Sequence, residues 1–307
     1  MSVKLNAKNT WQFIKEVFEK WIDDKAPKLG AALSFYTIFS LAPLLVIAIS
    51  VAGFIFGPEA VRGELVGQIK DLAGQEGAEV VQTALKNANN PDSGIIAVVI
   101  SLITLFIGST VVFVELQESL NIIWRVKPKP GRSMIKGLLK DRVQSFALVI
   151  ATGFLLLVSL LVSTALSATS NYISESFITI PLYVLDIANM VISLGVIYLL
   201  FAMIYKVLPD VHISWNDVWI GGLVTASLFV LGKYLIGIYL GSSSLSSTYG
   251  AAGSLVVLLL WVYYSAQILF LGAEFTYVYA NRLGSGIKPK SKFMKYEVIC
   301  PNLKLKN

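Results

Sequence analysis

Long runs of uncharged residues constrain this chain more than any other feature. Leu29 to Pro58 contains 30 residues without a charged side chain, and three further runs contain 22, 32 and 19 residues. A helix needs about 20 apolar residues to cross the hydrocarbon of a bilayer, because each residue rises about 1.5 Å and lipid offers the backbone no hydrogen-bond partner. These runs therefore predict the first four membrane spans. The three further runs are Ser93–Val114, Val143–Ser174 and Ile187–Tyr205.

The last apolar block, Val218 to Thr276, is long enough for two spans. It is interrupted only by Lys233 and Glu274, and residues 241–253 in its middle are rich in glycine and serine, which favour turns. With 14% charged and 55% hydrophobic residues, the chain has too few polar side chains to cover a water-soluble surface. The sequence thus predicts an all-α integral membrane protein with six transmembrane helices. The expected spans are about 31–56, 94–114, 144–168, 182–205, 218–240 and 254–279.

The distribution of basic residues predicts the orientation. Of 25 lysines and arginines, 21 fall in residues 1–28, 115–142 and 206–217 and in the tail from Arg282 onward. Basic residues resist translocation, so these segments are expected in the cytoplasm. The net charge of +6 then reflects membrane topology and not a nucleic-acid partner. We expect a multi-pass protein of the bacterial inner membrane with both termini cytoplasmic, and residues 282–307 as a basic tail.

Two polar segments are predicted to form amphipathic helices. In residues 1–28, the apolar side chains from Trp11 to Ile22 fall at helical spacing, which favours an interfacial helix on the cytoplasmic membrane surface. Packing on the inner face of the protein is the alternative. The outer connection 59–92 is interpreted as two short helices, with a flexible loop as the alternative.

Ionisable groups within spans are costly, and each is a candidate for function. Lys233 lies about 10 Å and Asp186 about 6 Å from the outer face at helical rise, so the two are predicted to interact. The alternative is that Lys233 extends to the outer headgroups. Glu115 and Glu274 each follow a glycine by 21 residues and are expected near the inner interface, too far from Lys233 to pair with it.

Polar and small residues mark several spans. Ser34, Thr37 and Ser40 recur on one helical face together with Tyr36, and Tyr249 and Gln267 are further candidates for lining a cavity. Close helix packing explains the hydroxyl pattern equally well. Packing is also the preferred interpretation of the glycine series in span five. That series is Gly221, Gly222, Gly232 and Gly237.

The search for catalytic motifs is negative. The sequence has no Walker loop, no His-rich zinc motif, no Gly-x-Ser-x-Gly elbow and no dinucleotide fingerprint. Its single histidine, His212, and single cysteine, Cys300, cannot form a typical zinc site. Asp210 beside His212 is interpreted as a coincidence of two residues. No enzyme activity, cofactor or metal is therefore expected.

Several motifs resemble the YihY/BrkB family of bacterial inner-membrane proteins. They cover essentially residues 15–285 and comprise Ala31–Thr37 with Pro43, Asn121 with Trp124, Pro209 with Trp215, and Tyr249–Ser254 with Leu260–Tyr264 and Gly272–Phe275. The resemblance implies six membrane helices but no settled activity. Members have been labelled ribonuclease or virulence factor, and lipid transport has been proposed for relatives. Ribonuclease activity does not suit one histidine and a membrane-buried body.

Three functions follow from these observations. The first is transport of an amphipathic envelope component such as a lipid, through a cavity lined by spans one, two, five and six. The second is a scaffold that anchors an envelope-assembly protein. The third is a lipid-headgroup enzyme using Glu115, Glu118 and Glu274. Membrane lipids are the expected partners, and the sequence does not indicate an oligomeric state.

Overall fold

A computed structural model describes residues 7–56, 107, 111–128, 182–242, 253–290 and 293–295, together with single positions and short stretches between 62 and 83. Within these residues the protein is mostly helical. The expected third span, 144–168, and Tyr249 lie outside the described residues, as do most of span 94–114, most of the outer connection 59–92 and the end of the tail. The expected number of six spans therefore stays a prediction.

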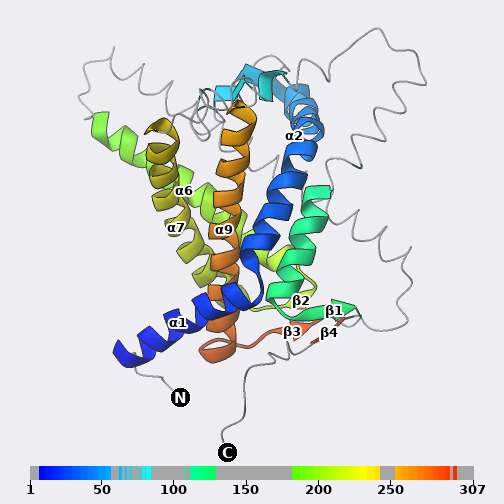
Figure 1. The fold of residues 1–307 in the computed structure, drawn as a ribbon. Coiled ribbons are helices and arrows are strands. Elements are labelled where there is room, and N and C mark those ends of the chain that lie inside the picture. The colour runs from blue at the N-terminus through cyan, green and yellow to red at the C-terminus, as the bar shows by residue number, and fades with distance from the viewer. Residues whose placement is uncertain are drawn as a thin grey trace, which may run out of the picture.

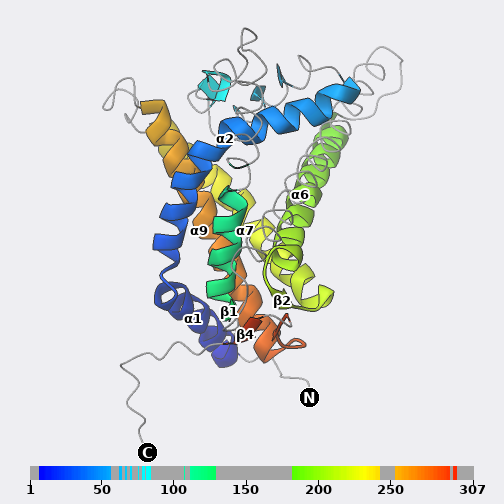
Figure 2. The same cartoon turned by 90° about the vertical axis from the view of Figure 1, so that its right-hand side faces the viewer.

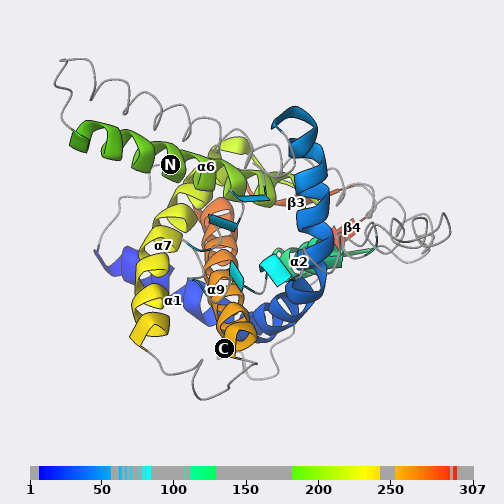
Figure 3. The same cartoon turned by 90° about the horizontal axis from the view of Figure 1, so that it is seen from above.

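Four long helices occupy the segments predicted as spans one, four, five and six. They are α2 (Ala26–Phe56), α6 (Leu182–Val207), α7 (Trp215–Ser242) and α9 (Gly253–Arg282). Figure 1 shows α9 between α7 and α2, and the view from above in Figure 3 agrees. Among the described residues, two helical stretches are long and apolar enough to cross a membrane, Trp215–Tyr239 and Leu255–Arg282.

Helix α1 (Ala7–Asp23) lies across one end of this bundle. One of its faces packs on α9, where the Phe13 and Phe275 rings meet edge to face at 5.3 Å. The opposite face is exposed and apolar, with Trp11 and Ile22 each more than 60% exposed. α1 thus combines a protein-facing and a free face, and its expected position on a membrane surface stays a prediction.

Four short strands lie at the same end as α1, as Figure 2 shows for β1 and β4. We call this the strand end of the bundle. β1 (Val126–Pro128) pairs antiparallel with β4 (Phe293–Lys295), and β2 (Val211–His212) pairs antiparallel with β3 (Lys288–Pro289). The segment after α9 therefore pairs, strand against strand, with the loop after helical residues 111–123 and with the loop between α6 and α7.

The α7–α9 contact contains two glycine–threonine pairs. Gly221 lies against Thr276, and Gly272 lies against Thr225. Each threonine hydroxyl donates to the carbonyl of the glycine one turn earlier in its own helix, both at 2.7 Å. The hydroxyls are thus satisfied locally while the missing glycine side chains let the backbones approach closely.

The packing interpretation of the glycine series is confirmed at three of its four positions. A side chain at Gly221, Gly222 or Gly232 would meet Thr276, Ala202 or Ile268, respectively. At Gly237 a Cβ would meet no described atom within 4 Å, so the interpretation stays a prediction at that position.

Candidate functional site

Two buried carboxyl groups meet at the strand end. Asp24 lies in the turn between α1 and α2 and is 6% exposed, while Glu274 on α9 is completely buried. The two side chains are close enough to act on each other electrostatically. Within the described residues, no N–H or hydroxyl group donates a hydrogen bond to Glu274, and the polar group within hydrogen-bonding range is the Asp24 carboxyl. We call Asp24 and Glu274 the carboxyl pair.

Arg125 is the cation that faces the carboxyl pair. Its Nη2 lies 3.5 Å from Oδ2 of Asp24, and its guanidinium lies 5.6 Å from the centre of the Tyr277 ring. Lys20 approaches the same ring at 5.3 Å, from α1. One aromatic side chain of α9 thus contacts both cations, an arrangement that the ring quadrupole favours.

Local backbone geometry places both members of this ion pair. Lys25, which directly follows Asp24, and Arg125 itself are the non-glycine residues with positive φ in the described part of the chain, at 54° and 57°. Each ends a helix, where a left-handed residue commonly stops the hydrogen-bond ladder. Trp124 fixes the second turn to α9, because its Nε1 donates to the carbonyl oxygen of Ala273 at 3.3 Å. Arg125 is thereby held beside Glu274, the residue after Ala273.

Burial sets the ionisation of Asp24. Removal from water raises the pKa of the Asp24 carboxyl, and the charge of Arg125 opposes this effect without cancelling it. Folding therefore favours the protonated form of Asp24. Its contribution to stability is complete below the ordinary aspartate pKa and is lost as the pH rises through the pKa of the folded protein.

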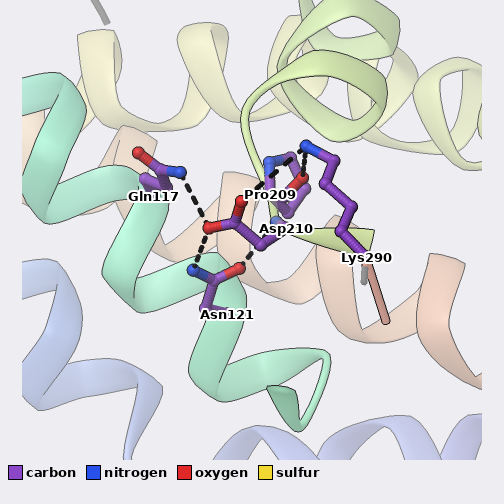
Figure 4. Close-up of polar contacts among 5 residues, drawn as sticks. All are labelled: Gln117, Asn121, Pro209, Asp210 and Lys290. Atoms are coloured by element: carbon purple, nitrogen blue, oxygen red, sulfur yellow. Dashed lines mark hydrogen bonds and ion pairs between the residues drawn. The ribbon is translucent and has the colours of Figure 1, made fainter. Parts of the chain in front are cut away.

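A second polar cluster holds the loop between α6 and α7. Figure 4 shows the Asp210 carboxylate accepting hydrogen bonds from Gln117 Nε2 at 2.9 Å and Asn121 Nδ2 at 3.1 Å. Asn121 Oδ1 accepts from the Asp210 backbone N–H at 2.9 Å, and Lys290 lies 3.8 Å from the other carboxylate oxygen. Two segments distant in the sequence thus converge on Asp210, residues 111–123 and the segment after α9, and none of these partners is His212. We call these four side chains the Asp210 network.

Replacing Asn121 with alanine should lower the stability of the protein by about 2 kcal/mol, because it leaves the buried Asp210 carboxylate and N–H each short of a partner. Thermal unfolding of the purified protein in detergent measures the effect. Asn281→Ala is the matched control, since Asn281 is exposed and bonds only a carbonyl of its own helix. Equal thermal midpoints for the two variants would contradict the assigned role of Asn121.

Polar residues also line the contact between α2 and α9. Gly30 lies against Gln267, whose Nε2 would be 2.0 Å from an added Cβ. The hydroxyls of Ser34 and Thr37 donate to carbonyls of their own helix, as helix packing predicts. Ser40 Oγ and both amide atoms of Gln267 are buried without a partner among the described residues. We call Ser34, Thr37, Ser40 and Gln267 the α2–α9 polar stripe.

The remaining candidates from the sequence lie apart from the carboxyl pair. Lys233 is half-buried and has no ion-pair partner among the described residues, and the side chain of Asp186 lies outside them. Their interaction stays a prediction. Glu118 is exposed and is the charged neighbour of half-buried Glu115. Tyr36 is exposed.

Sequence reasoning identified Glu274 but missed the groups around it. Arg125 was counted only as a basic residue of a cytoplasmic segment, and Asp24 and Gln117 were not considered. A signal was present in their positions, since both charges directly follow the end of a helix, where a side chain can reach a neighbouring helix. No group of three or more His, Cys, Asp or Glu side chains that could hold a metal occurs in the described parts of the chain.

Two described helices are long and apolar enough to cross a membrane, and buried charges lie at one end of the bundle. The family described as "Virulence factor BrkB" matches residues 17–297, and the chain belongs to this family. Its relatives include three UPF0761 membrane proteins, and no solved structure matches. They come from Ralstonia nicotianae (27% identity, covering 82% of this chain and 55% of the relative), Psychrobacter sp. (25%, 92% and 51%) and Tolumonas auensis (27%, 87% and 86%).

The share of a relative's length that this chain covers differs from one relative to another. It spans about half the length of the Ralstonia and Psychrobacter proteins. It spans most of the Tolumonas protein, where 86% of the relative is covered. The matched region covers more than four-fifths of this chain in all three comparisons.

Proposed function

We propose that this protein moves an amphipathic envelope component, such as a lipid, across the bacterial inner membrane without converting it chemically. It acts as a multi-pass protein with both termini, and therefore the strand end, at the cytoplasmic face. The observation that carries the proposal is the pair of polar side chains on α9, Gln267 and Glu274. Both amide atoms of Gln267 are buried without a partner among the described residues, and the buried Glu274 carboxyl faces a second acid, Asp24.

Unpartnered polar atoms inside a membrane helix are costly and usually have a water or ligand partner. Gln267 and Glu274 are two helical turns apart and share one face of α9. Gln267 meets α2 at Gly30, and Glu274 meets Asp24 directly before α2. Together they place two polar side chains about 10 Å apart along the α2–α9 contact. A headgroup moving along this contact would find hydrogen-bond partners that lipid chains do not offer.

The scaffold remains the second candidate because α1 keeps an apolar face free. Four large side chains on that face are between 43% and 68% exposed. An envelope-assembly protein could dock there without any movement of lipid. The exposed side chains are Trp11, Ile14, Phe18 and Ile22.

Lipid movement can be measured directly in liposomes that contain the full-length protein and fluorescent phosphatidylethanolamine or phosphatidylglycerol. Dithionite quenches only the outer leaflet, so translocation appears as additional quenching. We expect Gln267→Leu to slow it about tenfold, the effect of losing one buried hydrogen bond of about 1.4 kcal/mol. Ser227→Ala is the matched control, since Ser227 is exposed on α7 and bonds its own helix.

Two results would count against transport. One is no translocation of either lipid while a known scramblase works in parallel. The other is a Gln267→Leu variant as fast as the wild type. If the first result is accompanied by loss of function in cells after substitution of Trp11 and Phe18, the scaffold function is favoured instead.

A further inference from the structure

The charges around the carboxyl pair do not balance when every group is ionised. Asp24 and Glu274 would carry two negative charges in a buried site, and Arg125 is in ion-pair contact with Asp24. Lys20 is also near, but it lies over Tyr277 and 3.8 Å from Glu16. The titratable and charged groups that face the pair are Lys20 from α1, Arg125 from the turn after residues 111–123, and Tyr277 from α9, while Glu16 of α1 acts on Tyr277.

The geometry within the site distinguishes its two acids. Asp24 has the ion pair with Arg125 at 3.5 Å, whereas Glu274 has neither an ion-pair partner nor an N–H or hydroxyl donor among the described residues. An isolated buried carboxylate costs several kcal/mol, and two adjacent carboxylates cannot both ionise cheaply. One proton on the pair removes both costs and leaves a single negative charge opposite Arg125.

We propose that the carboxyl pair is a proton-binding site at which Asp24 and Glu274 share one proton and Arg125 balances the remaining charge. The site loads and unloads from the strand end, where Arg125 is 19% exposed. When the proton leaves to water, both carboxylates are charged and Arg125 is their common counter-ion. Loading therefore changes the forces between three separate segments: the α1–α2 turn, the turn after residues 111–123, and α9.

This inference goes beyond the proposed function and deepens it. The proton site itself does not depend on which molecule the protein moves. Its use as an energy source does rest on the proposed function. A proton that enters at the carboxyl pair alters the contact between α9 and the start of α2, which is also the contact that carries the polar stripe. Substrate movement would then respond to a pH gradient.

Infrared spectroscopy of the full-length protein in liposomes tests the site, because a protonated carboxyl group has its own C=O stretching band. We expect wild type to retain such a band at about pH 7, where ordinary aspartates and glutamates are ionised, and to lose it at higher pH. Glu274→Gln should lose the band at that pH. Glu118→Gln, which removes an exposed carboxyl group, should keep it.

Asp24→Asn separates a shared proton from a glutamate that is protonated on its own. If the proton is shared, this variant frees Arg125 to neutralise Glu274, and the band at about pH 7 disappears. A band that survives in Asp24→Asn overturns the sharing. Absence of the band from wild type, which needs no variant to fold, overturns the site altogether.

The lipid assay keeps the two proposals apart. If the C=O band is present in wild type and lost in Glu274→Gln and Asp24→Asn, but no lipid is translocated, the proton site is supported and transport is contradicted. Where translocation is present, an inward or outward pH gradient should change its rate in wild type and have no effect in Glu274→Gln. Equal responses of the two proteins would overturn the coupling.

Discussion

Gly221→Ala should destabilise the protein by about 3 kcal/mol, the upper part of the range for overpacking in a well-packed contact. An alanine Cβ at this position would lie 1.9 Å from Oγ1 of Thr276 and 2.9 Å from its Cβ and Cγ2. The Thr276 Cβ is attached to the α9 backbone and cannot rotate away, so α7 and α9 must separate. The thermal midpoint in detergent should fall accordingly.

Gly237→Ala is the matched control, since it lies in the same helix and its added Cβ meets no described atom within 4 Å. It should be neutral or stabilising, because alanine favours helix over glycine by about 1 kcal/mol. The double variant Gly221→Ala with Thr276→Gly removes all three clashing atoms and should recover part of the loss. A Gly221→Ala protein as stable as Gly237→Ala would show that the helices do not approach as closely as described.

Arg125→Gln should cost about 3 kcal/mol at neutral pH, the low end of the range for removing one partner of a buried ion pair. Asp24, with a side chain only 1% exposed, would lose its counter-ion. Thermal unfolding in detergent measures the loss. Arg282→Gln serves as the control, because Arg282 pairs with Glu16 at a site where its side chain is 45% exposed, and such pairs contribute at most about 1 kcal/mol.

The pH dependence of the Arg125→Gln effect has a definite sign. Burial raises the pKa of Asp24, and loss of Arg125 removes the charge that opposes this effect. Stability from protonated Asp24 is present at acidic pH and is lost as the pH rises above the ordinary aspartate value. The variant should therefore approach wild-type stability at about pH 4 and fall behind it at about pH 8. A difference that does not change with pH would contradict this account.

The apolar runs were enough to locate the long helices. α6 begins at Leu182 and α9 at Gly253, each within one residue of the predicted span, because hydrophobic length and turn-forming residues are local properties. α2 begins at Ala26, five residues before the expected span, because the helix continues through Lys28, which interrupts the apolar run.

The contacts of the candidate site were beyond the reach of the sequence. Glu274 could be recognised as a costly buried acid from its place in an apolar helix. Its neighbours Asp24 and Arg125 are about 250 and 150 positions away, and only the packing of α1, residues 111–123 and α9 brings them together. Asp210 shows the same limit, since its partners Gln117, Asn121 and Lys290 come from both sides of it in sequence.

The strand pairs at one end of the bundle restrict how the helices can move. β3 and β4 connect α9 to the loops that follow residues 111–123 and α6, while the ion pair of Asp24 and Arg125 connects the start of α2 to the same region. Relative displacements of these helices are therefore smallest at this end and increase with distance from it. We expect the strand end to be the pivot of any tilting motion, so that a gap between α2 and α9 would widen first at the opposite end of the bundle.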